Sequence, residues 1–404
     1  MPSARSSTPS RFPSPGEFSV LTRQGIAVVV AGILAVVVGR VFGVIELFVI
    51  GAAFFCTAIA AVVYVRLRRP IVTANRWVHP AVLVAGDTGR VDLQLEHRGR
   101  IRSAPFTLSE SVRRTMGDDH VARLPMAPMP PRQRTSTGYK LPTSRRGVIA
   151  LGPLAVEITD PLGVARWRSS IVDVDEVMVA PRVHHLDMPQ LGQGALGGAL
   201  LAKAIRLGPG EFHGLREYAD GDEPRTIHWK ASARTDTLMV REHTMEGLQR
   251  CTVVFDADRR AHPDAAAFER GVTAAASLVH NAARSGLTTR FVTSGGIDLR
   301  GPEVAVNTLR VLARVEPTDA SPGSIDRETG DGLGLVVVVT GSSSSPAWAK
   351  ASAVIDPTLT AVLVATDPTS STTGAMSIVT GNDDDFVPSW QSLAGHHRLD
   401  LAAR

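Results

Sequence analysis

The sequence predicts a membrane-anchored protein of several domains: a two-helix transmembrane hairpin, an antiparallel β-sandwich, and an α/β domain with a mainly parallel sheet. Three observations predict this order. Two apolar runs lie close together between residues 25 and 65. Short strands bounded by turn residues fill residues 71–186. After residue 251, apolar strands alternate with helical segments, and the length of 404 residues allows for more than one hydrophobic core.

The membrane hairpin is predicted over residues 21–69. Residues 47–65 are long enough to span a bilayer, which takes roughly 20 residues. Residues 25–39 reach that length when Leu21, Val41 and Phe42 are included and Arg40 extends to the interface. A cleaved signal peptide is disfavoured for this first run, because the second run follows almost at once and no small-residue cleavage site fits between them.

Charge around the two runs predicts their orientation. The short connection carries only Arg40 and Glu46, whereas arginines lie on the outer side of both runs. The positive-inside rule therefore predicts a multi-pass protein of two helices whose N-terminus and soluble domains are cytoplasmic. Residues 1–20, rich in Ser and Pro, are predicted to be a disordered cytoplasmic tail. The flanking arginines are Arg5, Arg11, Arg23, Arg66, Arg68, Arg69 and Arg76.

Composition limits the classes of partner. The formal net charge is only +4, and much of the basic excess lies beside the apolar runs, which favours membrane lipid over nucleic acid. A basic stripe with interleaved aromatic residues, typical of nucleic-acid binding, does not occur in the sequence. Cys56 lies in an apolar run and Cys251 opens a predicted strand, so both are expected to be buried thiols in a reducing compartment.

The middle of the chain, residues 71–186, is predicted to form the β-sandwich. Asp160, which precedes Pro161, is expected to form a turn and not a catalytic site. Residues 187–250 follow as a linker and a charged segment, and residues 190–202 are predicted to be a hinge or a loose helical linker. The strands are predicted at residues 81–84, 91–95, 148–151, 154–158, 166–172 and 177–180.

Residues 214–242 hold the densest group of charged residues, turn residues and large rings in the chain. Asp220 and Gly221 predict a tight turn, Asp222 can cap a short helix, and Pro224 fits the first turn of that helix. Arginines and carboxylates are nearly balanced, which predicts an ion-pair network within the fold. The residues expected to act as a binding surface or a structural latch are Arg216, Tyr218, Asp220, Gly221, Asp222, Arg225, His228, Trp229, Lys230 and Arg234.

This segment resembles the signature of the bacterial family called domain of unknown function 58 (DUF58). The family pattern is G-L-R-x-Y, then G-D-x-x-R-x-I-x-W-x-x-[ST]-A-R, then V-R-E, and every element is present between residues 214 and 242. The resemblance continues at residues 145–148, 151–153 and 160–163. It implies an immunoglobulin-like sandwich between the membrane hairpin and the signature.

The last part of the chain, residues 251–404, is predicted to be an α/β domain with a C-terminal tail. Strands are predicted at residues 251–256, 287–292, 333–340 and 360–365, with a helix at 264–281. The DUF58 resemblance implies a domain similar to the von Willebrand factor A fold, whose Asp-x-Ser-x-Ser motif holds Mg²⁺. Here Asp256, Asp258 and Arg260 stand at the three motif positions, so we expect no metal, with Asp256, Asp258 and Thr340 as weak candidates. The expected alternative is that Asp256 and Asp258 pair with nearby arginines.

The residue types of a catalytic triad also occur in the signature, as Asp222, His228 and Ser232. They lie within one short turn and helix, and no Gly-x-Ser-x-Gly nucleophile elbow occurs in the chain. Activation of Ser232 would also need an oxyanion hole, which nothing in the sequence indicates. Ile227 and Trp229 are expected to anchor the signature helix in the core. We therefore predict no catalytic residues.

The function predicted is that of a non-enzymatic, membrane-anchored adaptor. The resemblance implies a MoxR-type AAA+ ATPase as partner, together with a membrane protein that carries a transglutaminase-like domain, in the assembly or remodelling of a membrane or cell-envelope target. The alternative is a membrane-bound hydrolase that uses Asp222, His228 and Ser232, or a metal at Asp256. A third hypothesis, a scaffold that binds anionic lipid or the cell envelope, needs no ATPase.

Overall fold

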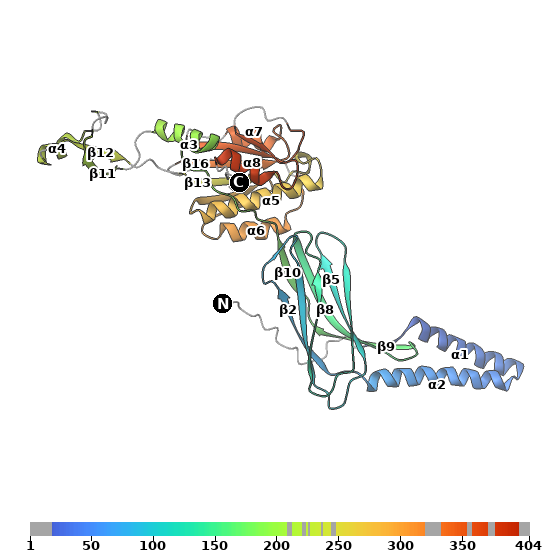
Figure 1. Cartoon of the computed structure of the whole chain (residues 1–404). Coiled ribbons are helices and arrows are strands. Elements are labelled where there is room, and N and C mark those ends of the chain that lie inside the picture. Colours follow the sequence, from blue (N-terminus) through green and yellow to red (C-terminus); the bar gives the residue numbers. More distant parts are fainter. Residues whose placement is uncertain are drawn as a thin grey trace, which may run out of the picture. The chain divides into compact units, whose positions relative to one another are not determined.

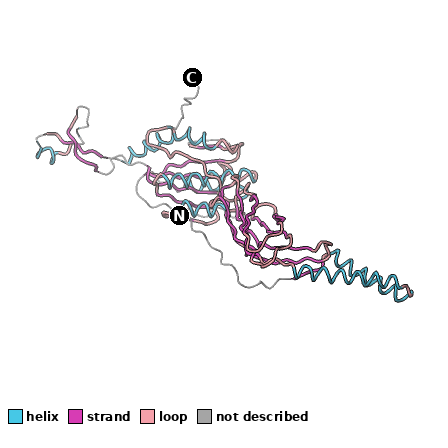
Figure 2. Tube along the Cα trace, turned by 60° about the horizontal axis from the view of Figure 1, so that its bottom comes forward, coloured by secondary structure: helices cyan, strands magenta, loops and turns pink. Residues whose placement is uncertain are grey.

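The structure is a computed structural model that describes residues 18–207, 212–219, 224, 227–235, 237–243, 248–319, 333–353, 358–370 and 376–395. The chain forms two compact units, Met1–Ala180 and Pro181–Arg404. The first holds two long helices and two β-sheets, and the second holds a helix-covered sheet and a small separate β-hairpin (Figures 1 and 2).

The two expected apolar helices are present as α1 (Arg23–Phe42) and α2 (Ile45–Leu67), both long and apolar enough to cross a membrane. Thr22 caps α1 by accepting a hydrogen bond from the backbone N–H of Gly25, and Gly43 ends it at a φ of 67°. The helices lie side by side (Figure 1). A Cβ at Gly51 would lie 2.9 Å from the carbonyl oxygen of Gly32, so glycines allow this close approach.

Two sheets follow the helices, and buried residues of both belong to one hydrophobic cluster. Residues predicted as two strands around Gly152 form one continuous strand, β8 (Gly147–Thr159), because this strand keeps its pairing with β5 (Phe106–Arg114) past Gly152. The three-stranded sheet contains β2 (Val72–His79), β4 (Gly89–His97) and β7 (Arg134–Leu141). The seven-stranded sheet contains β1 (Phe18–Leu21), β3 (Leu83–Val84), β5 (Phe106–Arg114), β6 (His120–Met126), β8 (Gly147–Thr159), β9 (Ala165–Val172) and β10 (Asp175–Ala180).

A buried ion pair joins the two sheets. Arg76 of β2 donates to Glu110 of β5 over 2.5 Å, and their side chains are only 5% and 1% exposed. Tyr139 of β7 donates its hydroxyl to the other oxygen of Glu110 over 2.8 Å. Burial, with the charge of Glu110, raises the pKa of Tyr139 far above its usual value. The network thus joins β2 and β7 of one sheet to β5 of the other.

The predicted turn at Asp160 is confirmed. One carboxylate oxygen of Asp160 accepts the N–H of Ala165 over 2.5 Å, and the other accepts the N–H of Leu162 over 2.9 Å. The turn contacts the start of α1, because Thr22 donates its N–H to the carbonyl of Val164 over 2.9 Å and its hydroxyl to the carbonyl of Gly163. Asp160 therefore has a structural role at the base of the helix pair.

The second unit is built on a six-stranded sheet. The strand order is β15 (Asp298–Arg300), β14 (Thr288–Thr293), β13 (Leu248–Phe255), β16 (Leu333–Thr340), β17 (Leu359–Ala365), β18 (Ser377–Val379). Only β15 is antiparallel to its neighbour, so the predicted mainly parallel sheet is confirmed. All eight residues of β16 are buried, as expected for a strand covered on both faces.

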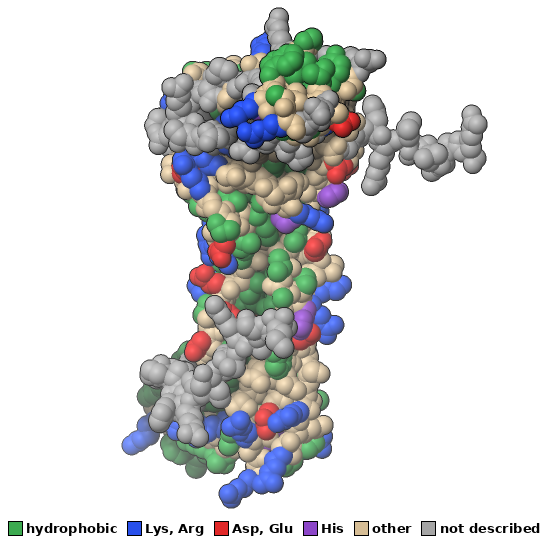
Figure 3. Space-filling model, turned by 90° about the vertical axis from the view of Figure 1, so that its left-hand side faces the viewer, with side chains coloured by type: hydrophobic (Ala, Val, Ile, Leu, Met, Phe, Trp, Pro, Cys, Tyr) green, Lys and Arg blue, Asp and Glu red, His purple; other side chains and the backbone are tan. Residues whose placement is uncertain are grey.

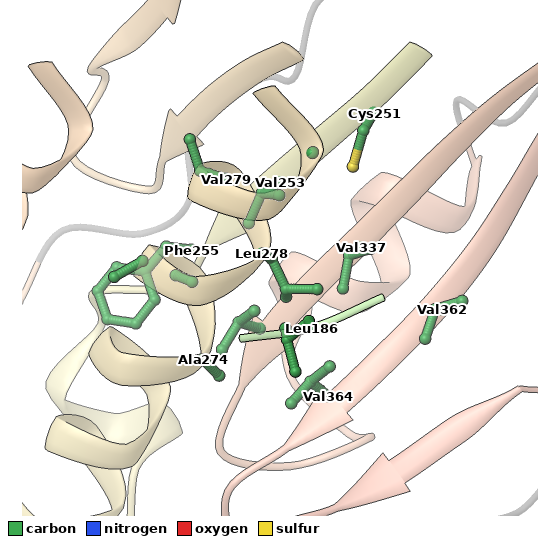
Figure 4. Packing of buried hydrophobic residues seen from close by; sticks show 14 of the residues in the cluster. Leu186, Cys251, Val253, Phe255, Ala274, Leu278, Val279, Val337, Val362 and Val364 are labelled. Carbon is green, nitrogen blue, oxygen red and sulfur yellow. The ribbon is translucent and has the colours of Figure 1, made fainter. Parts of the chain in front are cut away.

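Helices cover both faces of this sheet. On one face α5 (Ala265–Arg284) brings Leu278 and Ala274 against Val253, Phe255 and Val337 (Figure 4). On the other face, α7 (Pro346–Ala353) contributes Ala351 to a smaller cluster. The strand residues of this cluster alternate along β13 and β16 with those of the larger cluster. Further helices in the unit are α3 (Gly194–Leu207), α6 (Val304–Arg314) and α8 (Phe386–Ala394).

Residues 190–202, predicted to be a hinge or a loose helical linker, are mostly helical, but the helix is packed and not loose. Most of this segment belongs to α3, and Leu196 and Leu200 are fully buried in the larger core cluster. These two leucines lie four residues apart, so they share one face of the helix. Gly197, between them, lies against the carbonyl of Gln190, with which a Cβ would collide.

Candidate functional site

The strongest site candidate lies where the strand order of the six-stranded sheet reverses. The chain proceeds outward from β13 to β14 and β15, and outward from β16 to β17 and β18. Such a reversal opens a crevice at the carboxyl ends of the two central strands, where ligands of α/β sheets bind. Asp256 follows β13 and Thr340 ends β16, and the Thr340 hydroxyl donates to Asp256 Oδ2 over 2.9 Å. The structure thus brings two predicted candidates into contact.

Asp256 is held by three donors. Besides Thr340, the Ser345 hydroxyl donates to Oδ2 over 2.6 Å, and the N–H of Asp258 donates to Oδ1 over 3.1 Å. Asp256 is only 1% exposed, so these bonds replace the water that its carboxylate has lost. The expected pairing of Asp256 with an arginine is wrong, because hydroxyls and a backbone N–H take that place. Ser345 was not predicted, although a run of four serines after an apolar strand is a usable signal.

Asp258 is paired as expected. Arg260 donates to both of its carboxylate oxygens, over 3.1 and 2.9 Å, and also donates its backbone N–H. This side-chain hydrogen bond from Arg260 is the main reason that the pKa of Asp258 lies below its usual value. The pairing holds Asp258 as a carboxylate whose charge is matched within three residues of chain.

His262 completes the cluster and was not predicted. Its Nε2 lies 2.7 Å from the carbonyl oxygen of Asp256, and its Nδ1 lies 3.2 Å from the Thr366 hydroxyl. Since a carbonyl only accepts, Nε2 carries the proton and Nδ1 accepts from Thr366. Burial lowers the pKa of His262, which keeps the ring neutral. His262 therefore links the segment after β13 to the end of β17.

This set of oxygen atoms does not fit a hard divalent cation. Both carboxylate oxygens of Asp258 are bound to the guanidinium of Arg260, which brings positive charge to the place where a cation would need negative charge. The hydroxyls of Thr340 and Ser345 point their protons at Asp256. Within the described ranges, no group of three or more His, Cys, Asp or Glu residues is arranged to hold a metal.

The signature segment forms a small structure of its own. Strands β11 (Phe212–Glu217) and β12 (Met239–His243) pair as a two-stranded antiparallel sheet, and helix α4 (Trp229–Thr235) lies between them in the chain. Tyr218 donates its N–H to the carbonyl of Leu238 over 2.8 Å, and exposed Arg216 donates to the carbonyl of Glu217 over 3.1 Å. Four predicted residues lie outside the described residues: Asp220, Gly221, Asp222 and Arg225.

His228 and Ser232 fasten α4 to β12. The Nδ1 of His228 accepts the N–H of Ala231 over 3.0 Å, which caps the helix, and the backbone N–H of His228 donates to the carbonyl of Met239 over 2.7 Å. The Ser232 hydroxyl accepts the N–H of Met239 over 2.8 Å and donates to the carbonyl of His228 over 3.2 Å. Both side chains thus bind backbone groups, as a structural latch does.

The predicted burial of Trp229 is wrong. Trp229 is 66% exposed, because α4 has only seven residues and turns its latch side, with Ser232, toward β12. Ile227 is half-buried and bridges Val240. Lys230 and Arg234 of the same helix are exposed. The helix therefore presents a large ring beside two cations.

A pocket of about 670 Å³ lies at the opposite end of the strands from Asp256, near the start of β13. Its walls come from residues 185–191 and from the end of α5. Its volume is in the range of small-molecule sites. None of the residues predicted for a site lines it.

Comparison with known families supports the resemblance of the signature segment to DUF58. The model of the family described as "Protein of unknown function DUF58" matches residues 214–323, which include the signature and the first part of the six-stranded sheet. No curated protein matches the chain.

Solved structures give only weak likenesses. A β-glucosidase of Erythrobacter marinus is 9% identical over 28% of this chain, with a TM-score of 0.20, and the chain spans 15% of that enzyme. A CARDB domain of a Pyrococcus furiosus protein, in complex with metal ions, is 10% identical over 26% of this chain and 96% of its own, with a TM-score of 0.17. A putative ApaA protein of Bordetella pertussis is 9% identical over 28% of this chain and 94% of its own, with a TM-score of 0.21. TM-scores this low do not establish a shared fold.

Proposed function

We propose that this protein is a non-enzymatic, membrane-anchored adaptor whose signature segment binds a protein partner. The main support is that Trp229 is exposed on a helix that His228 and Ser232 fasten to β12. Tryptophan and arginine are enriched among the residues that dominate protein–protein binding energy. A large ring on a fixed support also loses little conformational entropy when it binds.

The membrane part of the proposal rests on α1 and α2. Both are long and apolar enough to cross a bilayer, and their large apolar side chains are mostly exposed, as lipid-facing side chains are. The arginines at the outer ends of the pair support a cytoplasmic location for the soluble units. In this arrangement the signature segment is available to cytoplasmic proteins.

For the soluble units we propose an immunoglobulin-like sandwich and a von Willebrand factor A-like domain. The strand order of the second unit, with an antiparallel edge strand β15 and Asp256 directly after the central strand β13, supports the second assignment. The site at Asp256 departs from that fold's metal-binding pattern, because Arg260 neutralises Asp258. Any recognition at this edge would then be independent of a divalent cation.

The partner we propose is a MoxR-type AAA+ ATPase, acting with a membrane protein that carries a transglutaminase-like domain. The support for this is the resemblance of the signature to DUF58, together with the family match at residues 214–323. In this hypothesis the ATPase remodels a membrane or cell-envelope target that this protein presents.

Affinity purification from solubilised membranes tests the proposal. The full chain would be recovered with and without ATP and Mg²⁺, and co-purifying proteins would be identified by mass spectrometry. We expect nucleotide-dependent recovery of an AAA+ ATPase, lost in Trp229→Ala. Trp77→Ala is the matched control, since Trp77 is also exposed, at 41%, but lies in β2 of the first unit. Equal recovery in both variants would contradict the assignment of the surface.

The hydrolase alternative has less support from the geometry. The Ser232 hydroxyl bonds the backbone of His228 and Met239, and the His228 ring bonds the backbone of Ala231. Among the described residues, Ser232 therefore makes no side-chain hydrogen bond to a base. Asp222, the third residue of that hypothesis, lies outside the described residues. Turnover of an acyl or phosphoryl substrate that disappears in His228→Gln while the protein stays folded would restore this alternative.

A further inference from the structure

We propose that the turn at residues 160–164 and the loop at residues 98–102 seat the first unit on an anionic bilayer surface, with Leu162 entering the boundary between headgroups and acyl chains. This inference rests on the proposed membrane anchoring by α1 and α2. It adds a second contact with lipid, made by the β-sheet part of the unit, that the helices alone do not require.

The turn lies at the depth of the first helical turn of α1. Val164 accepts the N–H of Thr22 over 2.9 Å, and a Cβ at Gly25 would collide with the carbonyl of Val164. A helix that crosses a bilayer begins at the interface, so a turn packed on its first residues lies there too. Leu162, at the tip, is 67% exposed, and Asp160 holds the turn rigid through two backbone N–H groups.

A second apolar tip lies at the same end of the unit. Ile71, 63% exposed, follows α2 by a few residues, and its carbonyl accepts the N–H of Arg98 over 2.8 Å. This bond brings the loop at residues 98–102 to the end of α2, and Ile101 in that loop is 66% exposed. Leu162, Ile71 and Ile101 are thus exposed large apolar side chains at the end of the sheets from which the helices leave.

Charge at this end fits anionic lipid. Of the acids there, Asp160 accepts two backbone N–H groups of its own turn, Glu96 lies 3.6 Å from Arg134, and Glu157 lies 3.4 Å from Arg168. At the opposite end of the strands, Asp87, Asp118 and Asp119 lie among the arginines. Figure 3 shows Lys and Arg side chains gathered beside apolar ones at the bottom of its view. The exposed arginines at the helix end include Arg68, Arg98, Arg100, Arg102, Arg132 and Arg166.

This combination favours a bilayer over a protein partner. Apolar tips surrounded by arginines form an interfacial surface, in which the tips reach the acyl boundary and the guanidinium groups stay among the headgroups. The surface is continuous with the ends of two helices that are apolar enough to span the membrane. A lipid surface is therefore already adjacent, whereas a protein partner would have to displace it.

Site-specific fluorescence quenching in vesicles tests the inference. The full chain, with Cys56→Ala and Cys251→Ala, would carry one cysteine labelled with an environment-sensitive fluorophore, in vesicles that contain phosphatidylglycerol and spin-labelled lipid. The probe position is Leu162→Cys. Val37→Cys, on an exposed face of α1, reports insertion of the helices, and Thr88→Cys, in an exposed loop at the opposite end of the strands, reports background.

The expected result is loss of fluorescence at positions 162 and 37, with none at position 88, and weaker loss at 162 in purely zwitterionic vesicles. Quenching at 37 without quenching at 162 would overturn this inference and leave the anchoring intact. Absence of quenching at 37 would overturn both. Quenching at 162 that does not depend on anionic lipid would overturn the role of the arginines. A blue shift at 162 without quenching would point to a protein contact and also overturn the inference.

Discussion

Ser345 donates its hydroxyl to Asp256 over 2.6 Å, although the two residues lie 89 positions apart in the chain. The bond joins the segments that follow β13 and β16, the two central strands of the six-stranded sheet. The bond lies at the carboxyl ends of these strands, where α/β sheets bind ligands. Side chains of the domain itself thus link the two strands between which the strand order reverses.

Asp256→Ala is expected to destabilise the second unit. It leaves the buried hydroxyls of Thr340 and Ser345 without their acceptor, which costs about 1–3 kcal/mol per unsatisfied group. The thermal midpoint of unfolding measures the effect. Asp367→Ala is the matched control, because Asp367 also follows a buried parallel strand, β17, but among the described residues its carboxylate accepts from nearby Thr369 and not from a distant strand. Equal midpoints for the two variants would contradict this role of Asp256.

Divalent cations are expected to leave the second unit unchanged. Arg260 already occupies both oxygens of Asp258, so Mg²⁺ would have to displace a bidentate ion pair. Thermal unfolding of the wild-type chain would be measured with Mg²⁺ and with a chelator, and compared with Arg260→Ser. A rise in the wild-type midpoint that the chelator reverses would show that a divalent cation does bind at Asp256 and Asp258, and would contradict this expectation.

Stability is expected to fall as the pH falls below about 6.5, the usual pKa of histidine, because of His262. Burial lowers its pKa in the fold, so between the two values the unfolded chain binds more protons than the folded one. Stability is therefore full above the unfolded pKa and is lost as the ring must charge. His262→Gln should flatten this part of the pH profile, whereas His185→Gln, at an exposed position, should not. Identical pH profiles of stability for the wild-type chain and His262→Gln would contradict this role of His262.

Glu110→Ala is expected to be among the most damaging changes in the first unit. It leaves Arg76 charged, buried and without its carboxylate, which costs about 3–5 kcal/mol. Tyr139→Phe removes one hydrogen bond to the same carboxylate and should cost about 1.5–3 kcal/mol. Denaturant unfolding in detergent compares the two, and a larger loss for Tyr139→Phe would be inconsistent with the network described.

Continuous hydrophobicity made part of this fold predictable. The eight residues of β16 are all apolar, Gly or Thr, and α1 and α2 are apolar for most of their length, so the sequence alone marks them. β2, β5 and β7 were not predicted, because charged or polar residues interrupt them. Arg76 and Glu110 are buried only because they meet across 34 residues of chain, which no local pattern reveals.

The candidate site was predictable in its residue types and not in its contacts. Asp256 and Asp258 were singled out because they stand at the motif positions that the family resemblance implies, and Thr340 because it ends an apolar strand, where α/β sheets place their chemistry. Ser345 and His262 were missed, since their partners depend on which strands become neighbours in the sheet. Trp229 was expected to anchor the helix in the core. A helix of seven residues has too little surface to bury both Ser232, which faces β12, and the ring of Trp229.

The measurement that tests the central claim most directly is site-specific photo-crosslinking in native membranes. A photoreactive amino acid would replace Trp229 in one version of the chain and Trp77 in another, both being exposed tryptophans. We expect a covalent adduct with an AAA+ ATPase from position 229 and none from position 77. Absence of any protein adduct at position 229, or the same adduct at both positions, would contradict it.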